Sequence, residues 1–323
     1  MAIKPFLIAT GLAGVAGFTG VVAWVGAGEI WQALSQAGPG ILLVAAFHLI
    51  PLGLDALSWW ALLKHHDQRS ALWALKLRWI GQSVNGLLPA AQVGGDVLRV
   101  RLSIADGVKA SLATASVVAD LTLAVLTQAV YSALGVLALL ALGLSLGDGL
   151  LGPLALGLVL FASVGGLFIA LQNADLLAKV ARFAEALLGS KKDWSAKAEA
   201  VDQSLKTIYA DRNALAEALL WRMGGWITGT GEVWIGLWLL DHPISLGEAF
   251  MIEALIQAVR SAAFIIPGAL GIQEIALVVL GGTAGIGPET ALALSLIKRA
   301  RELLVGLPGL LTWQVWEARR LRA

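Results

Sequence analysis

The sequence predicts an all-α polytopic membrane protein with about six transmembrane helices and two re-entrant helical hairpins arranged as an inverted repeat. Of its 323 residues, 58% are hydrophobic and only 14% are charged, with a mean hydropathy of +0.79. This composition excludes an ordinary soluble globular protein. Several apolar runs exceed the roughly 18 residues that cross a bilayer. Two segments interrupted by proline and glycine also match each other, which predicts the hairpins.

Six segments are predicted to cross the membrane. They are residues 6–25, 39–63, 112–144, 151–171, 223–240 and 290–313. The first follows a single lysine and has no obvious cleavage site, so it is interpreted as a signal anchor rather than a cleaved signal peptide. We expect one integral domain over residues 1–323, with repeat 1 at about 39–146, a connector at 173–222 and repeat 2 at about 223–313.

Lysine and arginine are distributed unevenly among the loops. The loops at 26–38 and 241–248 and the turn near Asp148 contain neither residue, whereas the loop at 64–78 contains four. Eight more lie in the connector, and three arginines close the sequence. Because cytoplasmic loops carry an excess of these cations, both termini and the connector are predicted to face the cytoplasm.

The two interrupted segments have the same layout. They read NGLLPAAQVGGD at 85–96 and AAFIIPGALGIQE at 262–274, and a carboxylate follows each proline by seven residues: Asp96 after Pro89, and Glu274 after Pro267. Proline and glycine free backbone groups that lipid cannot satisfy, so such segments must face protein or a water-filled cavity. Paired interruptions of this kind point to the central site of a transporter. We therefore predict hairpins at 79–98 and 249–283.

Ionisable residues inside membrane segments are candidate functional residues because burying a charge in a bilayer is costly. The candidates for substrate binding, together with the two prolines, are Asn85, Asp96, Arg99, Asp120, Glu232, Glu253, Arg260, Glu274, Arg299 and Arg301. A polar cavity lined by Arg260 and by Arg299 or Arg301, with Glu253 and Glu274, is expected. The alternative is an ion-pair network that only joins hairpin to helix.

Other candidates have simpler alternatives. Asp55 is near the end of its span and could reach the inner interface, while Glu232 lies among small residues and could be a hydrogen-bonding group between packed helices. Arg99, at the mouth of the first hairpin, has the planar fork that suits phosphate.

No catalytic constellation is evident. The four histidines, at positions 48, 65, 66 and 242, are placed at the two faces of the membrane and lack metal-binding spacing. Cysteine is absent, which excludes a disulfide framework and thiolate chemistry. We expect no enzymatic activity, no cofactor and no metal.

At NGLLPAAQVGGDVLRVRL and IIPGALGIQEIALVVL the chain resembles the family of the lysylphosphatidylglycerol synthase transmembrane region, which includes the flippase part of the MprF proteins. The positions that match the family pattern are Asn85, Pro89, Gly94, Gly95, Asp96 and Arg99 in the first motif and Pro267, Gly268, Gly271 and Glu274 in the second. The family's arginine in the last span corresponds to Arg299 or Arg301. The aminoacyl-transferase domain of MprF proteins does not follow residue 323, so lipid modification is not expected.

Within this family the chain looks most similar to the HpnL group, which is associated with hopanoid biosynthesis. The resemblance implies a lipid flippase or lipid-transport protein that handles a hopanoid or another polar or anionic lipid in a cavity between the hairpins. Hopanoid-pathway proteins are implied as partners, a homodimer is left open, and nucleic acid is not expected. The alternatives are a non-transporting assembly factor and a lipid-modifying enzyme that uses an acid–base pair such as Asp96 with Asp120.

Overall fold

The computed structural model describes residues 37–88, 93–144, 194–262 and 271–320, together with Ser35, Gly166 and Ala269. Every element in these ranges is helical. The elements are η1 (Gly38–Gly40), α3 (Ile41–Phe47), α4 (Leu49–Leu63), α5 (Ala71–Leu87), α6 (Gly94–Ala105), α7 (Ala110–Ala141), α10 (Trp194–Ala210), α11 (Arg212–Leu239), α12 (Leu246–Ala262), α13 (Ile272–Thr283) and α14 (Pro288–Arg320). The predicted spans at 6–25 and 151–171 lie outside the described residues.

Among the described residues, two stretches of helix are long and apolar enough to cross a membrane, Gly38–Leu63 and Ala110–Ala141. The first is divided at His48, which separates α3 from α4. Pro51 explains this break, because proline has no N–H to bond to the carbonyl four residues earlier and its ring crowds that carbonyl. The break places an imidazole in the middle of a membrane-spanning rod.

The helices follow the same order of lengths in the two halves of the chain. The helices α5, α6 and α7 have 17, 12 and 32 residues, and α12, α13 and α14 have 17, 12 and 33. Contacts repeat as well, since α5 packs against α14 and α12 packs against α7. The two halves are therefore built alike and exchange contacts.

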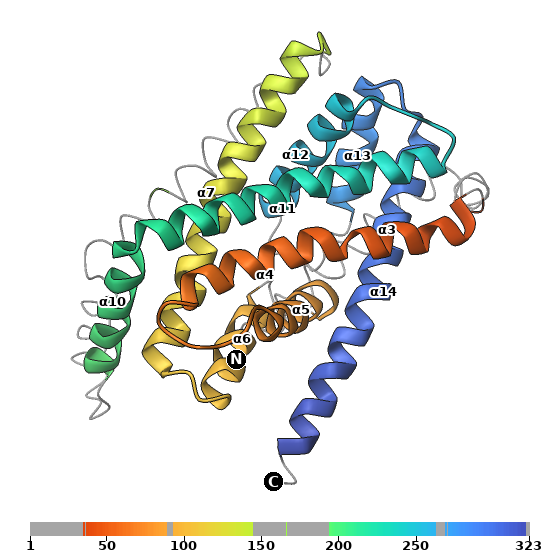
Figure 1. Cartoon of the computed structure of the whole chain (residues 1–323). Coiled ribbons are helices and arrows are strands. Elements are labelled where there is room, and N and C mark those ends of the chain that lie inside the picture. Colours follow the sequence, from red (N-terminus) through yellow and green to blue (C-terminus); the bar gives the residue numbers. More distant parts are fainter. Residues whose placement is uncertain are drawn as a thin grey trace, which may run out of the picture.

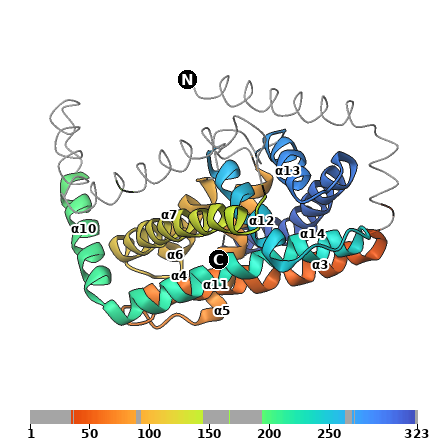
Figure 2. The same cartoon turned by 90° about the horizontal axis from the view of Figure 1, so that it is seen from above.

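A long central pair of helices separates the two sets. The rod α3–α4 and the helix α11 lie side by side, with α5 and α6 on one side and α12 and α13 on the other (Figure 1). They run antiparallel, because Gly40 approaches Leu239 at one end and Lys64 pairs with Glu217 at the other. Seen from above, this pair forms one layer on which α7, α12 and α14 are stacked (Figure 2).

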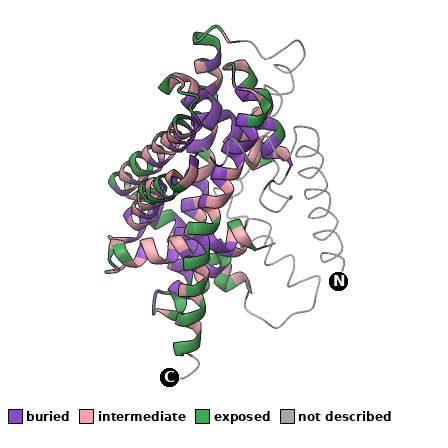
Figure 3. Ribbon diagram, turned by 90° about the vertical axis from the view of Figure 1, so that its right-hand side faces the viewer, coloured by how far each residue is buried: buried purple, intermediate pink, exposed green. Residues whose placement is uncertain are grey.

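The apolar core is divided between the halves. One cluster joins α11, α12, α13 and α14 around Ile252 and Leu294, and another joins α4, α5, α6 and α7 around Trp59 and Leu77. Buried surfaces lie where the helices meet and exposed surfaces lie outside (Figure 3). Many exposed side chains of α7 and α14 are leucine, such as Leu137 and Leu311, as expected for surfaces that face lipid rather than water.

Several predicted bounds differ from the structure. The helix α11 begins at Arg212 rather than at 223, because the Asp211 carboxylate accepts a hydrogen bond from the Ala214 N–H at 3.0 Å and caps the helix there. The last helix continues to Arg320 instead of ending at 313. The helices that flank Pro89 extend beyond the hairpin predicted at 79–98, since α5 covers 71–87 and α6 covers 94–105. Both hairpin tips, which contain Pro89 and Pro267, lie outside the described residues.

Candidate functional site

A polar cavity of about 270 Å³ lies where the rod α3–α4 meets α5, α11, α12 and α14. The helices α5 and α12, which are the first arms of the two predicted hairpins, both contribute residues to it. The polar side chains of its lining are His48, Asp55, Gln82, Asn85, Glu232, Glu253, Gln257, Arg260, Arg301 and Glu302. A cavity of this kind between helices of a membrane protein provides a place for a polar group that lipid does not solvate.

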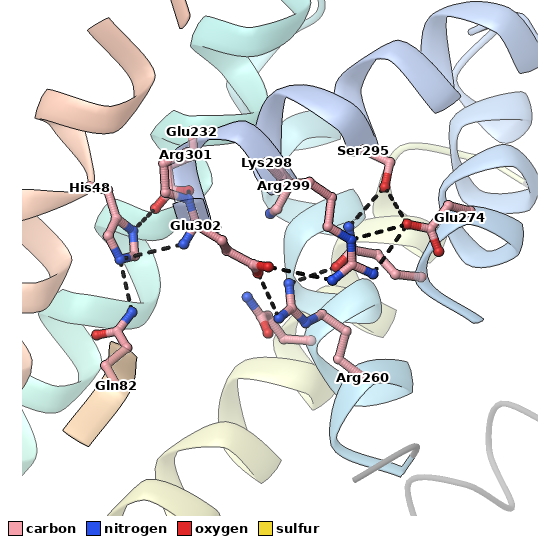
Figure 4. A network of polar contacts seen from close by, with 12 residues as sticks. His48, Gln82, Glu232, Arg260, Glu274, Ser295, Lys298, Arg299, Arg301 and Glu302 are labelled. Atoms are coloured by element: carbon pink, nitrogen blue, oxygen red, sulfur yellow. Dashed lines mark hydrogen bonds and ion pairs between the residues drawn. The ribbon is translucent and has the colours of Figure 1, made fainter. Parts of the chain in front are cut away.

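One wall of the cavity is a chain of contacts around Glu232. The His48 Nδ1 lies 2.6 Å from Glu232 Oε1, and Arg301 Nε lies 3.1 Å from the other oxygen of the same carboxylate. On its far side the imidazole contacts Gln82 from α5 at 2.8 Å. Figure 4 shows these side chains, which come from the break between α3 and α4 and from α5, α11 and α14. Glu232 is therefore held between two nitrogen groups rather than left exposed in the cavity.

A second wall is built around Glu302. Arg260 of α12 donates to Glu302 at 3.0 Å and to Gln273 Oε1 at 2.6 Å. Arg299 bridges Glu302 and Glu274, at 3.4 Å and 3.2 Å (Figure 4). Each guanidinium thus has at least one carboxylate partner already, which limits its capacity to bind an added anion.

Glu274 itself has a structural role at the start of α13. One of its oxygens accepts the Gly271 N–H at 2.7 Å, and the other accepts the Ser295 hydroxyl at 2.8 Å. Gly271 has a φ of +80°, which glycine adopts without strain. The carboxylate therefore satisfies a free N–H at a helix start and also fixes α13 to α14.

A separate network of charges surrounds Asp120, which is completely buried. Its carboxylate accepts from Arg78 at 2.7 Å, from Arg99 at 2.9 Å and from Arg222. Asp55 pairs with Arg78 at 3.0 Å and with Arg222 at 2.9 Å. Four helices, α4, α5, α7 and α11, are joined in this way, and Arg99 adds α6.

The start of α6 closes against the first arm of its hairpin. Asn85 accepts the Gly95 N–H at 2.7 Å and donates to Asp96 at 3.3 Å, and Asp96 pairs with Arg99 at 2.7 Å. A Cβ at Gly95 would lie 1.9 Å from the backbone oxygen of Gly81. Only glycine permits this close approach of two backbones.

Ion pairs lie at corresponding positions of the two halves, but the positive and negative partners are exchanged. Arg78 is the eighth residue of α5 and Asp120 the eleventh of α7. Glu253 is the eighth residue of α12 and Lys298 the eleventh of α14. The first pair is 2.7 Å apart and the second 2.5 Å. Each half therefore ties its first hairpin arm to its long helix with one buried ion pair.

The cavity lining carries more acidic than basic groups. It contains the four carboxylates Asp55, Glu232, Glu253 and Glu302, but only the two guanidinium groups Arg260 and Arg301, with His48 in addition. A lone phosphate would meet carboxylates that already occupy the arginines. The lining favours a ligand that presents hydrogen-bond donors or a positive group.

The predicted site residues fall into three groups. Those that line the cavity are Asn85, Glu232, Glu253, Arg260 and Arg301; those that lie in the ion-pair networks away from it are Asp96, Arg99, Asp120, Glu274 and Arg299; and Pro89 and Pro267 are outside the described part. The sequence did not decide whether Arg299 or Arg301 faces the cavity. In the structure, Arg301 lines it. Both the cavity and the structural network of the alternative hypothesis are present.

Sequence reasoning missed three polar groups. His48 was assigned to a membrane face, but it is 7% exposed and lies in the cavity wall. Arg222 was assigned to the polar connector, but it is 1% exposed inside α11. Glu302 was not among the predicted site residues, but it lines the cavity. The available signal for His48 was its position three residues before a proline in an apolar run.

Comparison with known proteins supplies one match. The family model described as the lysylphosphatidylglycerol synthase TM region matches residues 8–309. No curated protein and no solved structure matches the chain. The match covers both hairpin motifs and all the residues of the cavity lining.

Proposed function

Because this chain belongs to the family of the lysylphosphatidylglycerol synthase TM region, we propose that it translocates a lipid across the bacterial inner membrane. The family places it among membrane proteins with a lipid-related function. One observation carries the finer proposal: the first arms of both hairpins meet at one polar cavity beside helices long enough to span a bilayer. A lipid head entering this cavity would exchange water for hydrogen-bonding side chains while its tail remains in the bilayer.

The chemistry of the lining narrows the cargo. Carboxylates outnumber cations, and amide groups are contributed by Gln82, Asn85 and Gln257. These acceptors and donors suit a head group with several hydroxyls or an amine better than a bare phosphate. We therefore propose a hopanoid with a polyol or glycosidic head as the cargo, which agrees with the resemblance to the HpnL group.

Purified protein in liposomes tests the proposal. We expect it to move a hopanoid polyol, or a fluorescent phosphatidylethanolamine, between leaflets faster than protein-free vesicles. An ideal Cβ at Gly229, which lines the cavity, meets no atom within 4 Å. Gly229→Phe should therefore meet no clash at its Cβ, place a ring in the cavity and slow translocation.

Gly53→Phe is the matched control. Gly53 also has open space around an added Cβ, but it is not part of the cavity lining. Equal slowing by both variants would contradict translocation through this cavity. Failure of the wild-type protein to move either lipid, together with recovery of a hopanoid-pathway protein in stable complex, would favour the assembly-factor alternative.

We further propose that six helices span the membrane and that the two hairpins enter it from opposite sides. The matching helix lengths of the two halves and the uneven distribution of cations support this arrangement. Since the chain contains no cysteine, single cysteines report accessibility cleanly. Cysteines at Ser35 and Asp148 should react with an impermeant reagent in intact cells, and one at Lys192 should react only after lysis. Labelling of Lys192 from outside would overturn the topology.

A further inference from the structure

The imidazole of His48 lies in the cavity wall and has no role in the function proposed above. It is nearly buried, at the break between α3 and α4 that Pro51 produces. Histidine is the side chain whose charge ordinarily changes between about pH 5 and 8. Ionisable groups within membrane proteins commonly mark proton or ion pathways. The contacts of the ring show how this histidine could bind a proton on such a pathway.

The neighbours of the two ring nitrogens determine which of them carries hydrogen. Nε2 lies 3.4 Å from Arg301 Nη1 and 2.8 Å from the side-chain nitrogen of Gln82. A guanidinium has only donors, and Gln82 also presents its amide nitrogen to the ring, so we assign Nε2 as the nitrogen that accepts. In this tautomer the ring hydrogen is on Nδ1, which donates to Glu232 Oε1 at 2.6 Å. The ring is then neutral, with the lone pair of Nε2 directed at the Arg301 guanidinium.

We propose that Nε2 of His48 is a proton-binding site that couples lipid passage to proton movement. A hydronium ion from cavity water gives its proton to the lone pair of Nε2 and becomes water, while the imidazole becomes imidazolium. The new N–H then faces the Arg301 guanidinium, and the two cations repel each other. Arg301 moves away from the ring, and the cavity wall opens at the contact between α14 and the rod α3–α4.

The other charges around His48 are already paired, so Glu232 is the group that responds to its protonation. The polar groups that line the cavity around His48 are Glu232 of α11, Arg301 and Glu302 of α14, Gln82 of α5, Asp55 of α4, and Glu253 and Arg260 of α12, and Lys298 of α14 acts on Glu232 from outside the lining. Lys298 is held by Glu253 at 2.5 Å, and Asp55 by Arg78 and Arg222. Glu232 is shared by His48 and Arg301, so it stabilises the imidazolium and can release the arginine.

Nitrogen NMR of the whole protein in lipid nanodiscs, with labelled histidine rings, tests the proton site. The chain has four histidines, so His48→Gln identifies the signal of His48 by its loss. We expect this signal to show hydrogen on Nδ1 alone at about pH 8 and on both nitrogens at about pH 5. Hydrogen on Nε2 at the higher pH, or a single ring hydrogen throughout the range, would overturn the proposal.

The coupling of lipid passage to proton movement rests on the proposed lipid transport, and it is measured separately from the proton site. Liposomes of phosphatidylethanolamine and phosphatidylglycerol, with fluorescent phosphatidylethanolamine as the probe, are given a pH gradient. The gradient should change the translocation rate of the wild-type protein and of His242→Gln, which alters an exposed histidine outside the cavity. It should not change the rate of His48→Gln, whatever rate that variant retains.

The two arms of the test separate the two proposals. A rate that responds to the gradient in His48→Gln would overturn the coupling to His48. Translocation by wild-type protein whose His48 does not titrate would overturn this inference alone. A titrating His48 in a protein that moves no lipid would support the proton site and contradict the proposed function.

Discussion

Replacing Asp120 by alanine is expected to prevent most molecules of the protein from folding stably. Its carboxylate is completely buried and is shared by Arg78, Arg99 and Arg222. Removing it leaves three guanidinium groups for the two remaining carboxylates of the network. Breaking a buried ion pair by removing one partner costs about 3–5 kcal/mol in soluble proteins, and that loss is a large part of the usual stability of a protein.

The measurement is the yield of monodisperse protein and its thermal unfolding midpoint in one detergent. Asp55→Ala is the matched control, because Asp55 binds two of the same arginines but its side chain is 27% exposed. Water can reach the arginines that it leaves, so the loss should be smaller. If Asp120→Ala unfolds at the same temperature as the wild-type protein, the network around Asp120 does not hold the helices together.

Replacing Arg301 by lysine is expected to preserve folding but to reduce lipid translocation strongly. Arg301 lines the cavity and contacts Glu232 through Nε and His48 through Nη1. Lysine keeps the charge but has a single ammonium group in place of the planar fork, so it cannot hold both contacts with the same geometry. The changed geometry of the cavity wall is expected to raise the barrier to translocation by about 1.4 kcal/mol or more, which is a loss of roughly tenfold or more in rate.

Arg299→Lys is the control at the neighbouring arginine. Arg299 binds Glu274 and Glu302 but does not line the cavity, so its lysine variant should retain most of the translocation rate at similar abundance. The two variants are compared by translocation rate per amount of folded protein. Full activity in Arg301→Lys would show that this arginine is structural and would remove it from the candidate site.

The class of the protein and much of its fold were predictable from local sequence. Apolar runs mark the rod at 38–63 and the helix Ala110–Ala141, since bilayer thickness sets the length of a spanning helix. The spacing of proline, glycine and carboxylate predicted two hairpins, and the described residues on either side of each interruption form helices whose lengths match between the two halves. These signals are local, because each depends on residues within one segment.

The partners of the buried charges were decided by tertiary structure alone. His48 and Glu232 are 184 residues apart, and Arg222 and Asp120 are 102 apart. No periodicity within one segment indicates which of these groups meet. Arg222 looked like a loop residue because a charge in an apolar helix is costly, and only its carboxylate partners on α4 and α7 make that burial favourable. The sequence determined which segments are apolar enough to cross a membrane, whereas packing of distant helices determined which charges are neutralised and which line the cavity.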